Sequence, residues 1–328
     1  MDYAVKVLRL AICLFATVVW ICPSASWAQK FPSKSVRYVV PFGAGGSPDI
    51  VARLIADQLT RLWGEQVFIE NRVGAAGVLG TAYVAKSPPD GYTLIQCNIA
   101  SSAITVSLFA TMPYDQLRDI VPITRIGLTP NIITVHPSVP FRSLKALIAY
   151  AKAHPGELNY SSGLVGTSPQ LSMELFKLVA KVDMVNIPYK VGAQGITDTI
   201  GGQVPISISN FPASVAPVQS GQLRALAVTS AERASQLPNL PTIQESGFPG
   251  YDVSSWQGLC APAGTPVAVL DKLNTDINAV LRIPVIQRRL HELVMEGPPT
   301  SREEFDQFIR AEIARWAKVI KDAGIPQQ

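Results

Sequence analysis

Two loops of the sequence combine glycines with a Ser-Pro pair, a pattern that can bind an anion. The first is GAGGSPDIVARL at residues 43–54, and the second is GLVGTSPQLSMEL at residues 163–175. Ser47 and Ser168 are predicted N-caps, and the proline after each suits the first helical position, where a missing N–H costs nothing. The first turn of a helix leaves backbone N–H groups unpaired and carries a partial positive charge. Each loop could therefore bind a carboxylate, and the glycines would let it approach closely.

A simpler interpretation is that Gly-Ser-Pro only starts a helix well. Its recurrence at equivalent places in two strand-helix units favours the anion site. A dinucleotide site is not indicated, because Pro48 replaces the last glycine of GxGxxG, and a Walker A loop would need a Lys-Ser/Thr pair. Asp49 is expected in the first helical turn, where the helix dipole favours a carboxylate, so it is interpreted as a helix-start residue rather than a base.

Residue patterns for catalysis are weak. The three histidines, His136, His154 and His291, are scattered and form no metal-binding spacing, and no GxSxG elbow is present. Lys190 could contact an anion, although a solvated loop lysine is favoured. We therefore predict a protein that is not an enzyme and has no catalytic residue, metal or cofactor. The alternative, a secreted hydrolase using Ser161 or Ser162, lacks a recognisable base.

The elements that would position these loops alternate between strands and helices. Apolar extended runs at SVRYVVPF, VFIEN and GYTLIQC are separated by helical patterns, which predicts a parallel α/β sheet. The same order repeats from residue 131, and helices are expected near 266–282, 284–293 and 302–322. Long extended segments, ITRIGLTPNIITVHP and YDVSSWQGLCAPAG, connect the two units. We predict a discontinuous domain 1 at 29–130 and 255–328, with domain 2 at 131–254 inserted into it and a cleft between them.

The N-terminus has the pattern of a secretory signal peptide. Lys6 and Arg9 precede an apolar stretch from Leu10 to Cys22, and small residues at 26 and 28 predict cleavage after Ala28. An uncleaved anchor is the alternative, but the stretch is short for a bilayer. Residues 1–28 are thus a predicted signal peptide, and the mature chain is expected outside the cytoplasm.

Composition and cysteine usage limit the remaining classes. The 328 residues are 48% hydrophobic and 16% charged, with 28 Lys and Arg against 24 Asp and Glu. Because no basic run or basic aromatic face occurs, nucleic-acid binding is not expected. Cys97 and Cys260 could form a disulfide, but each lies in an apolar run, and two buried thiols are favoured.

Several segments resemble the Bug-type periplasmic solute-binding receptors of tripartite tricarboxylate transporters. Among them are VPFGAGGSPDIVAR, IENRVGAAGVLGT, VAKSPPDGYTL, IPYKVGAQGITDTIGGQV, LPTIQESGFPGY and WQGLCAPAGTP, in family order over almost all of the mature chain. The resemblance implies an α/β, two-domain periplasmic-binding-protein fold of type II, the Venus flytrap, with two crossover strands. It also implies a periplasmic, monomeric receptor that delivers a small carboxylated metabolite to membrane permease subunits.

In that family, two loops act as pincers on a ligand carboxylate, partly through ordered water. Carried over by motif, the first pincer comprises Phe42, Gly45, Gly46, Ser47 and Asp49. The second pincer comprises Ser161, Gly166, Thr167 and Ser168. Further positions predicted to line the cleft are Asn98, Ser101, Ser102 and Asn210. Gln170, Val191 and Gln194 depart from the family pattern, so the second pincer is expected to recognise a different ligand tail. The resemblance also leaves open a receptor that signals to a membrane sensor instead of a permease.

Overall fold

The computed structural model describes residues 31–328, and residues 34–328 are organised around one mixed β-sheet. The predicted signal peptide and its cleavage site lie outside the described residues. Within the described chain, no helix is both long enough and apolar enough to cross a bilayer.

The first section of the sheet follows the predicted order. β1 (Val36–Val40) lies between β2 (Val67–Asn71) and β3 (Thr93–Asn98) and is parallel to both. β9 (Ser254–Pro262) then pairs antiparallel with β3 and with the first part of β4 (Ile120–Val135). The carboxyl ends of β1 and β3 thus lie at one edge of this section, where loops can form a site.

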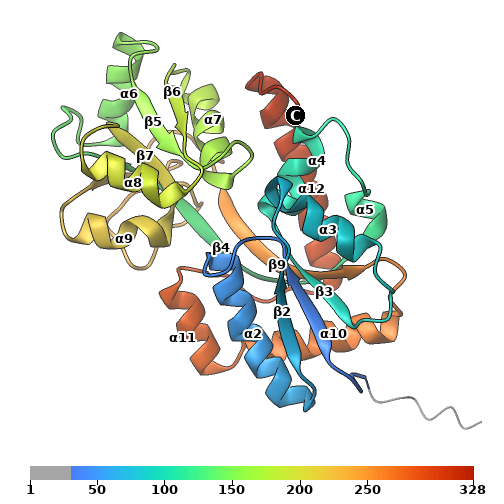
Figure 1. Ribbon diagram of the computed structural model, residues 1–328. Coiled ribbons are helices and arrows are strands. Elements are labelled where there is room, and N and C mark those ends of the chain that lie inside the picture. The colour runs from blue at the N-terminus through green and yellow to red at the C-terminus, as the bar shows by residue number, and fades with distance from the viewer. Residues whose placement is uncertain (1–30) are drawn as a thin grey trace, which may run out of the picture. The chain divides into compact units, whose positions relative to one another are not determined.

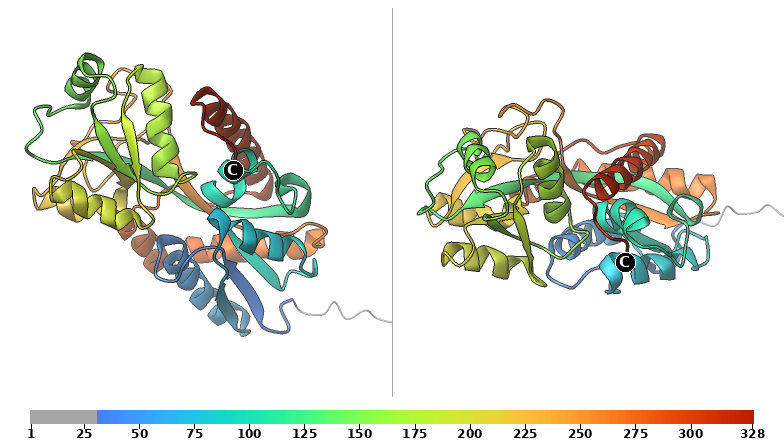
Figure 2. Two further views of the ribbon diagram at one scale, coloured as in Figure 1. Left: turned by 45° about the horizontal axis from the view of Figure 1, so that its top comes forward. Right: turned by 90° about the horizontal axis from the view of Figure 1, so that it is seen from above.

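The second section begins on the same long strand. β4 pairs with β9 as far as Pro130, and from Asn131 it pairs antiparallel with β7 (Ile206–Asn210). β8 (Arg224–Val228) also pairs with β4, and β5 (Asn159–Ser162) lies parallel between β7 and β6 (Val185–Pro188). β4 and β9 are therefore the two predicted crossover strands, and Figures 1 and 2 show both running from one group of helices to the other. The change of partner falls at the predicted 130/131 boundary; the division into two domains stays a prediction.

Helices connect the strands in both sections. In the first they are α2 (Ser47–Trp63), α3 (Val78–Ala85), the π-helical turn η2 (Ala100–Ile104), α4 (Thr105–Leu108) and α5 (Gln116–Asp119), with a 3-10 turn η1 (Ala75–Gly77) before α3. In the second they are α6 (Leu144–Ala153), α7 (Ser168–Ala180), α8 (Gly192–Ile200) and α9 (Phe211–Gln219). The chain ends in α10 (Val267–Leu281), α11 (Pro284–Glu292) and α12 (Arg302–Asp322), close to the predicted bounds.

α2 carries the first Gly-Ser-Pro loop at its start, and its buried face fixes its position. Val51, Ile55 and Leu59 are fully buried, whereas Ile50 and Leu62 are 44% and 53% exposed. The buried face also includes two alanines and Trp63. The helix ends at Gly64, whose left-handed φ of 73° lets its N–H bond the Thr60 carbonyl.

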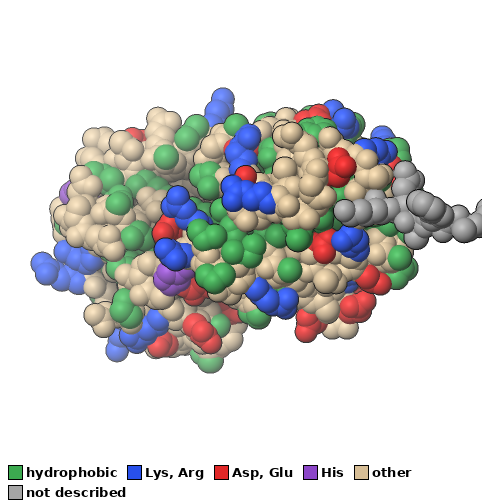
Figure 3. Space-filling view, turned by 90° about the horizontal axis from the view of Figure 1, so that it is seen from below, with side chains coloured by type: hydrophobic (Ala, Val, Ile, Leu, Met, Phe, Trp, Pro, Cys, Tyr) green, Lys and Arg blue, Asp and Glu red, His purple; other side chains and the backbone are tan. Residues whose placement is uncertain are grey.

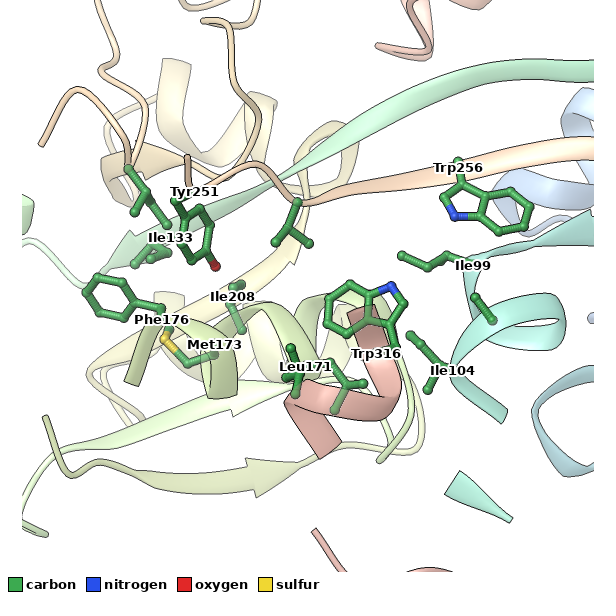
Figure 4. Close-up of a cluster of buried hydrophobic side chains, with 14 of the residues drawn as sticks. Ile99, Ile104, Ile133, Leu171, Met173, Phe176, Ile208, Tyr251, Trp256 and Trp316 are labelled. Carbon is green, nitrogen blue, oxygen red and sulfur yellow. The ribbon is translucent and has the colours of Figure 1, made fainter. Parts of the chain in front are cut away.

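A continuous core joins the two sections beside the crossover strands. Trp316 of α12 lies between Ile104 of η2 and Leu171 of α7, and all three are fully buried (Figure 4). The indole N–H groups of Trp316 and Trp256 both donate to Glu312 Oε2, at 3.1 and 3.0 Å. Both tryptophans are fully buried packing residues, and Glu312 satisfies their polar atoms.

The structure corrects the expected state of the cysteines. Cys97 of β3 and Cys260 of β9 form a disulfide, with Cα atoms 6.0 Å apart, so the expected pair of buried thiols is wrong. Antiparallel pairing brings these strands side by side, which the apolar character of each run could not reveal. The disulfide closes a sequence separation of 163 residues and ties β3 to a crossover strand.

The surface carries charges of both signs. Figure 3 shows Lys and Arg side chains interspersed with Asp and Glu side chains on one face, around hydrophobic side chains near its middle. No broad field of one sign appears on that face, as expected from the balanced composition.

Candidate functional site

The first Gly-Ser-Pro loop is exposed and ends in a helix start, but the cap differs from the prediction by one residue. Gly46 is the N-cap of α2, and Ser47 is its first helical residue. Gly45 adopts a left-handed φ of 79°, a conformation that glycine reaches without strain. Residues 43–47 are all exposed, so a solute can reach this loop.

The buried side chain of Asp49 fixes the conformation of the first Gly-Ser-Pro loop. Its carboxylate is 2% exposed and accepts hydrogen bonds from the Gly45 N–H, the Arg53 Nε and the Asn71 Nδ2, each at 2.9 Å. Burial alone would raise the pKa of Asp49, but the hydrogen bonds from Arg53, Gly45 and Asn71 outweigh it and lower the pKa to about 2. A saturated, ionised carboxylate of this kind positions the loop and does not act as a base.

The first turn of α2 offers unused donors. Among the described residues, no hydrogen bond uses the backbone N–H of Ser47 or Asp49, and the proline between them has none. The Ser47 hydroxyl oxygen accepts a hydrogen bond from Gln257 Nε2 of β9 at 3.0 Å. These donors suit an anionic oxygen.

The predicted residues after β3 lie beside this loop. A Cβ atom placed on Gly77 would come within 2.7 Å of Ser101 Cβ and 3.3 Å of Phe42 Cζ, so Phe42 and Ser101 are neighbours. Asn98 Oδ1 accepts the Ser101 N–H at 2.9 Å, which starts η2. Ser101 and Ser102 are 0% and 1% exposed, and this group therefore supports the first loop from inside.

The second Gly-Ser-Pro loop has the same local design and a different setting. Thr167 is the N-cap of α7, Ser168 is its first residue, and Gly166 has a left-handed φ of 86°. The Thr167 hydroxyl donates to the Leu164 carbonyl at 2.7 Å, within the loop. A Cβ atom on Gly166 would lie 2.6 Å from Leu108 Cδ2, so this loop packs against α4 of the first section.

Ser168 repeats the arrangement of Ser47. Its hydroxyl oxygen accepts a hydrogen bond from Asn131 Nδ2 of β4 at 2.9 Å, and its side chain is buried. In the described chain, the N–H groups of Ser168 and Gln170 take part in no hydrogen bond. Gln170 instead uses its side-chain oxygen to accept the Gly166 N–H at 3.3 Å. The two loops thus present the same set of donors on α2 and α7.

The other predicted residues of the second section have internal partners. Ser161 is 1% exposed and donates to the Gly195 carbonyl at 3.1 Å. Asn210 is the N-cap of α9, and its amide nitrogen donates to Asn131 Oδ1 at 2.9 Å. Lys190 is exposed, in agreement with the solvated lysine that was favoured.

Sequence reasoning missed two residues on the crossover strands, Gln257 and Asn131. They are 7% and 0% exposed, and each donates to the serine at the start of a helix. A polar amide inside an otherwise apolar strand is the signal that could have indicated them, because buried amides require partners.

Comparison with known proteins identifies the family. The model of the tripartite tricarboxylate transporter family receptor matches residues 51–325. The chain belongs to this family. BugT of Bordetella pertussis is 36% identical over 298 residues, which cover 90% of this chain and 91% of BugT. The resemblance inferred from the sequence is thereby confirmed.

Solved structures of the receptor family extend the comparison. Rpa4515 of R. palustris with adipate is 40% identical, with a TM-score of 0.81 over 90% of this chain and 99% of that chain. MatC of Rhodopseudomonas palustris with bound malate is 30% identical, with a TM-score of 0.75 over 88% and 100%. The predicted fold class, that of a periplasmic solute-binding protein, is confirmed by this similarity.

The two candidate nucleophiles, Ser161 and Ser162, have polar partners inside the second section. The Ser162 hydroxyl lies 2.7 Å from Asn186 Oδ1 and 2.9 Å from the Gly163 carbonyl oxygen, and its one hydrogen can serve either acceptor. Within residues 31–328, the hydrogen bonds of Ser161 and Ser162 involve carbonyl, amide and hydroxyl groups and no histidine or carboxylate. No group of three or more His, Cys, Asp or Glu side chains in those residues could hold a metal ion.

Proposed function

We propose that this chain is a periplasmic receptor that captures a small dicarboxylate at the starts of α2 and α7. One observation carries the proposal: both helices begin with a glycine loop, two unused backbone N–H groups and a serine held by a crossover-strand amide. The same donors on two sheet sections suit a ligand with acceptors at both ends.

The comparisons support the ligand class. Adipate is bound to a relative that is 40% identical to this chain, and malate to one that is 30% identical. Both ligands are short dicarboxylates, which differ in chain length and hydroxylation. The departures at Gln170, Val191 and Gln194 lie on or beside α7 and α8, where they would select the part of the ligand beyond the first carboxylate.

Membership of the family supports the remaining parts of the proposal. The signal peptide is cleaved after Ala28, the mature receptor acts as a monomer in the periplasm, and it delivers its ligand to the membrane subunits of a tripartite transporter. Residues 29–130 with 255–328, and residues 131–254, act as two domains that close on the ligand. Closure follows because only the closed form lets one ligand contact both helix starts.

A thermal-unfolding panel tests the proposal. The mature chain is heated with unbranched dicarboxylates of four to eight carbons, with malate, and with diols and monocarboxylates of matching length. At ~100 times its dissociation constant, a ligand stabilises the fold by about 2.7 kcal/mol, which raises the melting temperature by several degrees. If no dicarboxylate raised it more than the matching diol, the proposed ligand class would be wrong.

A further inference from the structure

Each of the two serines at a helix start accepts a hydrogen bond from an amide on a crossover strand. Gln257 of β9 donates to Ser47 Oγ at 3.0 Å, and Asn131 of β4 donates to Ser168 Oγ at 2.9 Å. The two contacts come from segments far apart in the sequence, and each joins a side-chain amide to a serine hydroxyl. They therefore repeat one arrangement in both sections of the sheet.

Further side chains fix the orientation of each amide. Gln257 Oε1 accepts from Gln96 Nε2 at 2.7 Å, and Gln96 Oε1 accepts from the Tyr38 hydroxyl. Burial raises the pKa of Tyr38 well above its ordinary value, so the phenol keeps its proton. An amide whose oxygen already faces a donor must present its NH2 group to the serine.

The second amide is oriented in the same way. Asn131 Oδ1 accepts from Asn210 Nδ2 at 2.9 Å, which leaves the Asn131 NH2 group for Ser168. Asn131 is fully buried, so the alternative amide orientation would set two donors against each other without water to separate them.

This orientation leaves the serine hydroxyl hydrogens unused. A hydroxyl has one donor hydrogen and two acceptor lone pairs, and the amide occupies only a lone pair. In the part of the chain that the structure describes, neither Ser47 Oγ nor Ser168 Oγ donates a hydrogen bond. The O–H can therefore join the free backbone N–H groups at the same helix start as a donor to an anion.

We propose that Gln257 and Asn131 are positioning residues that set Ser47 and Ser168 as hydroxyl donors to the two ends of the bound dicarboxylate. This inference rests on the proposed function. It places the specificity for an anion partly on the crossover strands, which contact the serines and not the ligand. If the amides were reversed, each serine would donate to an amide oxygen and would turn lone pairs toward the carboxylate.

Calorimetric titration with adipate and with malate tests the inference through a double-mutant cycle. The variants are Ser47→Ala, Gln257→Met and both together, with Ser168→Ala, Asn131→Leu and their combination for the second section. Each single change should weaken binding about 10- to 100-fold, the value of one hydrogen bond to a charged group. Each double variant should bind no more weakly than its weaker single variant, because the amide acts only through the serine.

Gln116→Met is the matched control, since Gln116 is a buried glutamine of α5 and belongs to neither chain of amides. It should leave the affinity unchanged. Urea unfolding of every variant separates lost binding from lost folding. If Asn131→Leu does not fold, the double-mutant cycle of Ser47 and Gln257 alone tests the positioning role. Unchanged affinity in Gln257→Met, or losses that multiply in the double variant, would overturn the positioning role while leaving the proposed function intact. Failure of the unmodified chain to bind either dicarboxylate would overturn both.

Discussion

Replacing Asp49 with asparagine should destabilise the protein and loosen the first loop at the same time. The carboxylate accepts three hydrogen bonds at 2.9 Å, from Gly45, Arg53 and Asn71. An asparagine side chain has one oxygen and would turn an NH2 group toward at least one of these donors. Gly45 and Arg53 share the Oδ2 atom, whereas Asn71 donates to Oδ1, so the single oxygen of asparagine would lose either the Asn71 contact or the Gly45 and Arg53 contacts.

The lowered pKa gives the magnitude. Since one pKa unit corresponds to about 1.36 kcal/mol, a fall from 3.8 to about 2 corresponds to about 2 kcal/mol of unfolding free energy. The unfolded carboxyl binds its proton at higher pH than the folded one. This contribution is therefore complete above pH 3.8 and is lost as the pH falls toward about 2.

Urea unfolding between pH 3 and pH 7 measures the effect. Asp49→Asn should lose about 2 kcal/mol at pH 7, and its difference from the unmodified chain should shrink below pH 4. Asp57→Asn is the matched control on the same helix, because Asp57 is exposed and contacts Arg61 in the following turn and the neighbouring Gln58 at the surface. It should change stability by less than about 0.5 kcal/mol. Equal effects of the two substitutions, or a pH-independent loss in Asp49→Asn, would refute the role assigned to Asp49.

Two further substitutions test how the sheet sections are joined. Gly166→Ala should lower the unfolding free energy by about 1–3 kcal/mol, because the new Cβ atom would lie 2.6 Å from Leu108 Cδ2. Gly221→Ala is the control, also at positive φ but in open space, and should lower it by about 1 kcal/mol or less. Equal melting temperatures of the two variants would contradict the packing of Gly166 against α4. Changing both Cys97 and Cys260 to alanine should lower the unfolding free energy by about 2–5 kcal/mol, as expected for a disulfide that closes a long loop. Stability that is insensitive to this change and to reduction by dithiothreitol would show that the disulfide does not form.

The local part of the fold was predictable, because it depends on short-range patterns. The helical patterns of the sequence placed α10, α11 and α12 within about two residues of their observed bounds. α9 was not predicted; it contains Pro212 at its start and Pro217 in its interior, a residue type that is unfavourable within helices. η2, α4 and α5 were missed because each is only four or five residues long.

In the candidate site, the sequence indicated the two helix starts but not the residues that support them. The glycines and Ser-Pro pairs identified both helix starts, because those residue types act within one turn. Gln257 and Asn131 could not be assigned, because the serines that they contact lie 210 and 37 residues away in the sequence. The Cys97–Cys260 disulfide was not predicted for a similar reason: it depends on the pairing of β3 with β9, which the sequence around either cysteine does not reveal.

A crystal structure of the mature chain with bound adipate or malate tests the central claim most directly. The account predicts one carboxylate within hydrogen-bonding distance of the Ser47 and Asp49 N–H groups, and the other near those of Ser168 and Gln170. A dicarboxylate bound elsewhere, or held mainly by Lys or Arg side chains, would contradict it.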